Sequence, residues 1–137
     1  MNHQGTKTPR EEVSLEVDLI AKQIVDAAFA VHTALGPGLL ESVYEICLAH
    51  ELRKRNLRMK RQVELPVIYE GIRIDAGFRL DLVVEGKVVV ELKAVEDLQP
   101  IHQAQVLTYL KLSKHRLALL INFNVSLIKN GIKRIAL

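Results

Sequence analysis

The stretch RLDLVVEGKVVVELK, residues 79–93, constrains the fold of this chain more than any other. It consists of two apolar runs separated by a Glu-Gly pair that is typical of a turn, and it therefore predicts a β-hairpin. A hairpin this apolar is expected to be buried, yet it carries Asp81, Glu91 and Lys93. The register of the two strands decides where these three charges lie.

Side chains alternate between the two faces of a strand, so Glu91 and Lys93 share one face. A three-residue loop over 85–87 places Asp81 directly opposite Glu91, whereas a two-residue loop would turn Asp81 to the other face. We predict the three-residue loop, because it also collects the apolar residues on one continuous face: Leu80, Leu82, Val84, Val88, Val90 and Leu92.

Two carboxylates that face each other on neighbouring strands are about 5 Å apart at Cβ and repel unless a positive charge lies between them. Asp81 and Glu91 are therefore candidate ligands of Mg²⁺ or Mn²⁺, which prefer oxygen donors. Lys93 on the same face would orient a water or stabilise charge on a phosphate, which predicts phosphodiester hydrolysis. The alternative is structural: both carboxylates form ion pairs with Lys93, Arg79 or Lys87 at a sheet edge.

The N-terminal part of the chain predicts a pair of helices. Apolar residues recur at helical spacing over 14–35 and over 40–55, and a Gly-Pro-Gly sequence separates the two segments. Asn56 is expected to end the second helix in the left-handed conformation. Residues 1–13 are polar and are predicted to form a tail, which leaves 14–137 as a single domain.

From Gln62 onward the apolar pattern has a period of two, which indicates strands. We expect strands over 62–69, 72–84, 88–93 and 116–123, followed by a terminal hairpin over 126–135 with Asn130-Gly131 at its tip. Pro66 cannot donate a hydrogen bond, so the first strand is expected at an edge or a bulge. A helix capped by Asp97 and ending near Ser113 precedes the fourth strand. This order, ααβββαβ(ββ), predicts an α/β fold with a central mixed sheet flanked by helices.

Taken together, these motifs resemble the PD-(D/E)XK nuclease superfamily, which has the restriction-endonuclease-like fold. Asp81, the hairpin and the sequence ELK at 91–93 resemble the core of that superfamily, and GLLESVY at 38–44 matches the signature of its GxxExxY members. Leu80 stands where the superfamily name has proline, a position that is often degenerate. The resemblance runs from about Ile20 to the end of the chain, and the fold it implies agrees with the predicted order of elements.

The resemblance implies a role for each residue of the motifs. Asp81 and Glu91 would be the principal metal ligands, with help from the backbone carbonyl of Leu92, and Glu41 would add a further acidic group at the metal. Lys93 would be catalytic. Glu41 also has a structural explanation, because a carboxylate early in a helix stabilises the helix dipole.

Gln105 and Tyr109 resemble the Gln-x-x-x-Tyr element of RecB-like nucleases. A spacing of four places both on one helix face, where the resemblance implies that they line the site near the phosphate. The alternatives are that Gln105 faces solvent and that Tyr109, like Tyr44, packs with its ring half-buried and its hydroxyl hydrogen-bonded.

The run RKRNLRMKR, residues 53–61, contains six basic residues and is the strongest candidate for contact with a nucleic-acid backbone: Arg53, Lys54, Arg55, Arg58, Lys60 and Arg61. A net charge of +3 suits a polyanionic partner. The alternative is that these residues complement the dipole at a helix C-terminus and solvate the surface.

We therefore expect a Mg²⁺-dependent (or Mn²⁺-dependent) nuclease that acts on DNA, with RNA as an open alternative. The competing function is a non-catalytic nucleic-acid-binding or assembly module that retains the fold. A lone domain offers little surface to grip a duplex, so a homodimer or a partner subunit is also expected. Cys47 is the only cysteine and no apolar run reaches about 18 residues, which predicts a cytoplasmic protein outside the membrane.

Overall fold

The computed structural model describes residues 9–137, with side chains from Ser14 onward. The elements, in chain order, are α1 (Pro9–Leu35), α2 (Glu41–Lys54), β1 (Met59–Glu64), β2 (Val67–Tyr69), β3 (Ile72–Ile74), β4 (Arg79–Val84), β5 (Val88–Lys93), α3 (Pro100–Ser113), β6 (Leu117–Asn122), the 3-10 helix η1 (Ile128–Gly131) and β7 (Ile132–Ala136). Part of the predicted tail, 1–8, lies outside the described residues. The helix that was expected from Ser14 begins earlier, at Pro9.

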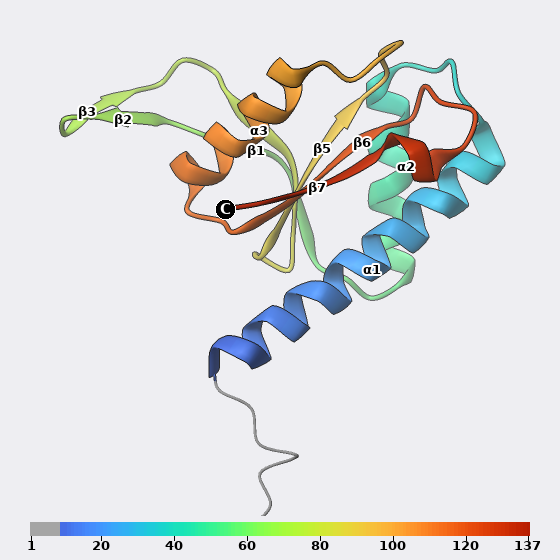
Figure 1. Cartoon of the computed structure of the whole chain (residues 1–137), viewed down its shortest axis with the longest axis horizontal. Coiled ribbons are helices and arrows are strands. Elements are labelled where there is room, and N and C mark those ends of the chain that lie inside the picture. Colours follow the sequence, from blue (N-terminus) through green and yellow to red (C-terminus); the bar gives the residue numbers. More distant parts are fainter. Residues whose placement is uncertain (1–8) are drawn as a thin grey trace, which may run out of the picture.

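A central five-stranded sheet has the order β1-β4-β5-β6-β7, while β2 and β3 form a separate hairpin. Strands β5 and β6 are parallel, and the other neighbours are antiparallel. Figure 1 shows α1 and α2 on one side of the sheet, α3 on the other, and the β2–β3 hairpin projecting from the body. The predicted α/β fold with a mixed sheet flanked by helices is therefore confirmed.

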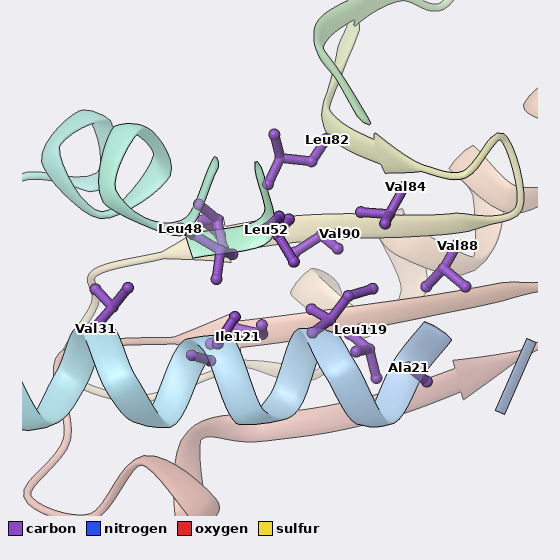
Figure 2. Packing of buried hydrophobic residues seen from close by; sticks show 14 of the residues in the cluster. Ala21, Val31, Leu48, Leu52, Leu82, Val84, Val88, Val90, Leu119 and Ile121 are labelled. Carbon is purple, nitrogen blue, oxygen red and sulfur yellow. The ribbon is translucent and has the colours of Figure 1, made fainter. Parts of the chain in front are cut away.

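The register predicted for the central hairpin is confirmed, because Val84 pairs with Val88 and Leu82 pairs with Val90 across a three-residue turn. The apolar side chains of this face pack beneath α1 and α2 (Figure 2). Leu80 departs from the prediction: it packs on the opposite face, against the α3 side of the sheet. The alternation of faces is thus interrupted between Leu80 and Leu82, at Asp81.

The turn between α1 and α2 is fixed by Tyr44. This side chain is fully buried, and its ring stacks on Phe123 with centroids 4.5 Å apart. Its hydroxyl donates to the carbonyl of Gly36 at 2.6 Å and accepts the N–H of Leu39 at 3.1 Å. The tyrosine of the GLLESVY motif is therefore a packing residue with a hydrogen-bonded tip, as predicted, but it is fully buried where a half-buried ring was expected. It sets the position at which α2 begins with Glu41.

Several predicted boundaries are wrong. The strand expected over 62–69 is two strands, since β1 ends before Pro66 and β2 begins after it; β1 does lie at a sheet edge, as Pro66 predicted. The strand expected over 72–84 is also two, because residues 75–78 separate β3 from β4. The N-cap of α3 is Gln99 and not Asp97. The backbone N–H of Gln99 donates to Nδ1 of His102 at 2.9 Å, the contact that the third helical residue makes in a capping box.

The terminal hairpin expected with Asn130-Gly131 at its tip is wrong too. Residues 128–131 form η1, and β7 pairs antiparallel with β6. A Cβ atom on Gly131 would lie 2.1 Å from the carbonyl oxygen of Asn122, so glycine is needed here for close backbone approach and not for a tip. Within residues 9–137, none of the helices combines the length and the apolar character needed to cross a membrane.

Candidate active site

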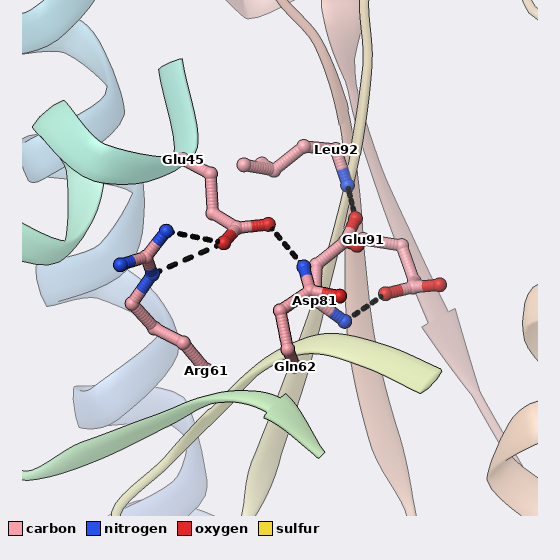
Figure 3. A network of polar contacts seen from close by, with 6 residues as sticks. All are labelled: Glu45, Arg61, Gln62, Asp81, Glu91 and Leu92. Carbon is pink, nitrogen blue, oxygen red and sulfur yellow. Dashed lines mark hydrogen bonds and ion pairs between the residues drawn. The ribbon is translucent and has the colours of Figure 1, made fainter. Parts of the chain in front are cut away.

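The acidic pair lies at the point where the ladder between β4 and β5 ends. Beyond the last pair, Leu82 with Val90, the backbone N–H of Asp81 donates to Oε2 of Glu91 at 2.7 Å. In return, the N–H of Leu92 donates to Oδ2 of Asp81 at 2.8 Å (Figure 3). Each carboxylate is thus held by the main chain of the opposite strand, so the hairpin itself fixes the geometry of the pair.

The structural alternative, in which the two carboxylates form ion pairs with neighbouring cations, is not what the structure shows. Across the described side chains, neither Asp81 nor Glu91 has a Lys or Arg nitrogen within ion-pair distance. Lys87 instead pairs with Glu16. The charge of the acidic pair is therefore left to be balanced by something else.

Burial and nearby negative charge raise the pKa of both carboxyl groups. Only 7% of Glu91 is exposed, and its burial, followed by the negative charge of Asp81, raises its pKa from 4.5 to about 8. Burial also raises the pKa of Asp81, and the charges of Glu45 and Glu41 add to the effect, while the N–H of Leu92 and the charge of Lys93 oppose it. The charge of Lys93 also opposes the rise at Glu91, but it does not cancel either shift, so a bound cation would add positive charge that the site can accommodate.

Lys93 is the last residue of β5 and is held by β6. It pairs with Asn122 in the parallel register, and its carbonyl accepts the N–H of Phe123 at 2.9 Å. The buried side chain of Asn122 also clamps the chain just after Lys93, accepting the N–H of Val95 at 3.1 Å and donating to the carbonyl of Val95 at 2.8 Å. Our sequence analysis missed Asn122, although it is a polar residue closing the otherwise apolar strand LALLIN.

The remaining predicted site residues lie on the two flanking helices. Glu41 is the exposed first residue of α2, and its charge contributes to the raised pKa of Asp81. Tyr109 of α3 is partly buried; burial, and then the charges of Glu91 and Asp81, raise the pKa of its hydroxyl. Gln105 is exposed one turn before Tyr109. The charge of Glu41 on α2 therefore affects the pKa of Asp81, and the charges of the acidic pair affect the pKa of Tyr109 on α3.

Glu45 was not predicted, and it is the buried centre of a polar network beside the acidic pair. Its Oε2 accepts hydrogen bonds from Nε and Nη2 of Arg61 at 3.0 and 2.9 Å, and its Oε1 accepts Nε2 of Gln62 at 2.7 Å (Figure 3). One signal was available in the sequence: Glu45 follows Glu41 by four residues and so shares its helix face.

Gln62 lies on β1 in an unusual backbone conformation. Its φ angle is 52°, in the left-handed region, which costs a non-glycine residue about 1 to 3 kcal/mol. The strand pairs on either side, Arg61 with Leu82 and Val63 with Leu80, place Gln62 opposite Asp81. The strain therefore sits next to the acidic pair.

The predicted nucleic-acid run, residues 53–61, is largely engaged in ion pairs. Glu51 pairs with Lys54 at 3.1 Å and with Arg55 at 3.8 Å, Arg58 pairs with Glu85 at 3.6 Å, and Arg61 is held by Glu45. The start of β1 also lies near the turn of the β4–β5 hairpin, away from Asp81. The pairs at the surface are weak enough to exchange for phosphate, so contact with nucleic acid stays a prediction for this run.

The donor set fits a divalent cation of the Mg²⁺ type. In proteins this ion binds through one or two carboxylates and retains several waters, and Asp81 and Glu91 supply such oxygens without an ion-pair partner among the described side chains. No group of three or more His, Cys, Asp or Glu side chains in the described part of the chain is placed to hold a metal. Two carboxylates are thus the available set, and direct ligation by Glu41 or by the Leu92 carbonyl stays a prediction.

A mixed α/β sheet whose central hairpin opens at an acidic pair, with a lysine two residues beyond, defines the PD-(D/E)XK class of protein. The family model described as the PD-(D/E)XK nuclease superfamily matches residues 18–135, so the chain belongs to that superfamily. Comparison with curated proteins and with solved structures gives no significant match.

Proposed function

We propose that the protein is a Mg²⁺-dependent or Mn²⁺-dependent nuclease that hydrolyses phosphodiester bonds in DNA, and that it belongs to the GxxExxY members of its superfamily. The observation that carries this proposal is the acidic pair: two carboxylates held by main-chain N–H groups, raised in pKa and left without an ion-pair partner. Nuclease superfamily membership supports it. A cytoplasmic location is part of the proposal, in line with the single cysteine.

In this proposal Asp81 and Glu91 hold the cation, and both must be ionised to do so. When bound, the cation would supply a hydroxide near neutral pH and neutralise charge on the phosphate. Lys93, fixed by β6, orients the water nucleophile or donates to a phosphate oxygen through its ammonium. Tyr109 and Gln105 act from α3 as hydrogen-bonding groups near the phosphate.

The proposal is tested by incubating the protein with linear, branched and single-stranded DNA in the presence of Mg²⁺ or Mn²⁺. We expect cleavage by the wild type, and a loss of at least about 100-fold in Lys93→Ala and in Glu91→Gln. Lys129→Ala, an exposed lysine on η1, is the matched control and should cleave like the wild type. Equal cleavage by every variant would reveal a contaminant, and binding without cleavage would favour the non-catalytic module.

We also propose that the active form is a homodimer or includes a partner subunit. A DNA duplex carries two scissile strands, and two copies would present one site to each. Light scattering with and without duplex DNA tests this point, and a monomer under both conditions would rule out the dimer. RNA enters the same cleavage assay as a competing substrate.

A further inference from the structure

We propose that Gln62 is a further residue of the active site: a positioning residue beside Asp81 that is itself held in place by Glu45 and Arg61. This inference rests on the proposed function and deepens it. None of these three residues belongs to the acidic pair or to the catalytic lysine, and the inference depends only on the contacts, the burial and the backbone conformation around them.

The first step is the place of Gln62 in the sheet. The pairing between β1 and β4 keeps the same register before and after it, so Gln62 is not an inserted bulge residue. Its positive φ angle departs from the extended strand conformation, and its side chain reaches Glu45 on α2. Gln62 is therefore opposite Asp81 in the register of the edge strand, while its side chain contacts a buried carboxylate of α2.

The second step is the orientation of the Gln62 amide. An ionised carboxylate only accepts hydrogen bonds, so the amide atom that contacts Oε1 of Glu45 must be the nitrogen. Among the contacts of the described residues, no donor to the Gln62 carbonyl oxygen is found. The amide is thus fixed at its nitrogen, and because Gln62 is exposed, its oxygen is open to water.

The third step is the rigidity of Glu45. The residue is only 6% exposed, and Arg61 binds its Oε2 through two N–H groups, which balances the buried charge. Since one carboxylate oxygen is held by Arg61 and the other by Gln62, the Glu45 side chain has little freedom to rotate. The Glu45 side chain therefore fixes the position of the Gln62 amide relative to α2.

The fourth step is the chemistry that a neutral acceptor offers at this place. The charges of Glu45 and Glu41 already act on Asp81, and a further carboxylate on β1 would add to the repulsion. An amide oxygen instead accepts a hydrogen bond from a water of the hydrated cation without adding charge. This function also explains why a residue of poor left-handed propensity occupies position 62, where glycine or asparagine would fit more easily.

The test is a titration with Mn²⁺ in the absence of DNA, followed by calorimetry or by the electron paramagnetic resonance of the free ion. The decisive variant is Gln62→Gly, which removes the amide; relief of the strained φ angle offsets the lost hydrogen bond to Glu45, and urea denaturation verifies that the variant is folded. We expect its dissociation constant for Mn²⁺ to rise about 10- to 100-fold, the usual effect of removing an outer-shell partner. Gln62→Asn, which tolerates the backbone but is too short to reach Glu45, should behave like Gln62→Gly.

The matched control is Glu70→Gly, because Glu70 also has a left-handed φ angle, 49°, but lies at the exposed turn between β2 and β3. It should bind Mn²⁺ like the wild type. Glu45→Gln should fall between the wild type and Gln62→Gly, since it keeps an acceptor for Gln62 and loses the ion pair with Arg61. Suppose that the wild type binds Mn²⁺ and cleaves DNA, and that Gln62→Gly does both equally well. The inference about Gln62 is then wrong, and the proposed function stands. A wild type that binds no Mn²⁺ overturns both.

Discussion

Replacing Glu91 with glutamine should make the protein more stable while it abolishes the proposed activity. The reason is the buried carboxyl group, whose pKa is raised from 4.5 to about 8 by burial and by the charge of Asp81. Between these two values the unfolded chain has lost this proton and the folded protein retains it, so the free energy of unfolding falls as pH rises. Glutamine has nearly the same shape, keeps an oxygen that accepts the N–H of Asp81, and does not ionise.

The size of the effect follows from the pKa difference. Each pH unit above 4.5 costs about 1.4 kcal/mol until the folded-state value is approached, so the cost at pH 7 is roughly 3 kcal/mol. Glu91→Gln should therefore match the wild type near pH 4 and exceed it by roughly 3 kcal/mol at pH 7. For a domain of this size, that difference corresponds to a rise in Tm on the order of 10 °C.

The assay is urea denaturation from pH 4 to pH 8 in the presence of a chelator, with Glu96→Gln as a control that removes an exposed carboxylate. Addition of Mg²⁺ should stabilise the wild type more at pH 8 than at pH 5, because protons compete with the cation, and should leave Glu91→Gln almost unchanged. If Glu91→Gln is no more stable than the wild type at pH 7, the claim that burial without a partner raises this pKa is refuted.

Three further changes test the framework around the site. Tyr44→Phe removes two hydrogen bonds of a buried hydroxyl and should lower the free energy of unfolding, measured by urea denaturation, by about 1 to 3 kcal/mol. The control Tyr69→Phe changes an exposed ring and should have no effect. Equal results for the two variants would contradict the role of the Tyr44 hydroxyl. Gly131→Ala places a methyl group against the carbonyl of Asn122 and should cost about 3 kcal/mol, and an unchanged Tm would disprove the close approach. Asn122→Ala releases Val95 and should lower the nuclease rate beyond its effect on stability, which a comparison of rates at equal folded fraction would show.

The hairpin that carries the acidic pair could be predicted from sequence because its strands alternate regularly from Leu82 to Leu92. Six apolar residues at a period of two leave a single register that keeps them together, and the turn length follows from it. The Leu80 error marks the limit of that alternation: the pattern carries no sign that the backbone changes face at Asp81, next to a strained residue on another strand.

The residues that support the acidic pair could not be predicted from the sequence, for a related reason. The roles of Glu45, Gln62 and Asn122 depend on contacts between segments that are distant in the chain, such as α2 with β1 or β6 with the residues that follow β5. Arg61 is an example: the sequence assigned it to a basic run that contacts nucleic acid, whereas in the structure it forms an ion pair with the buried Glu45. The terminal hairpin failed likewise, because Asn-Gly is typical of a tip and only the packed structure reveals the crowding at Gly131.

The position of Tyr44 has a consequence for how chains of this kind are classified. Its hydroxyl ties the first two helices together and its ring stacks in the core, so a descendant that had lost its metal ligands would still require it in order to fold. A signature that ends in this tyrosine thus indicates the fold. An assignment of enzymatic activity depends instead on the residues at positions 81, 91 and 93.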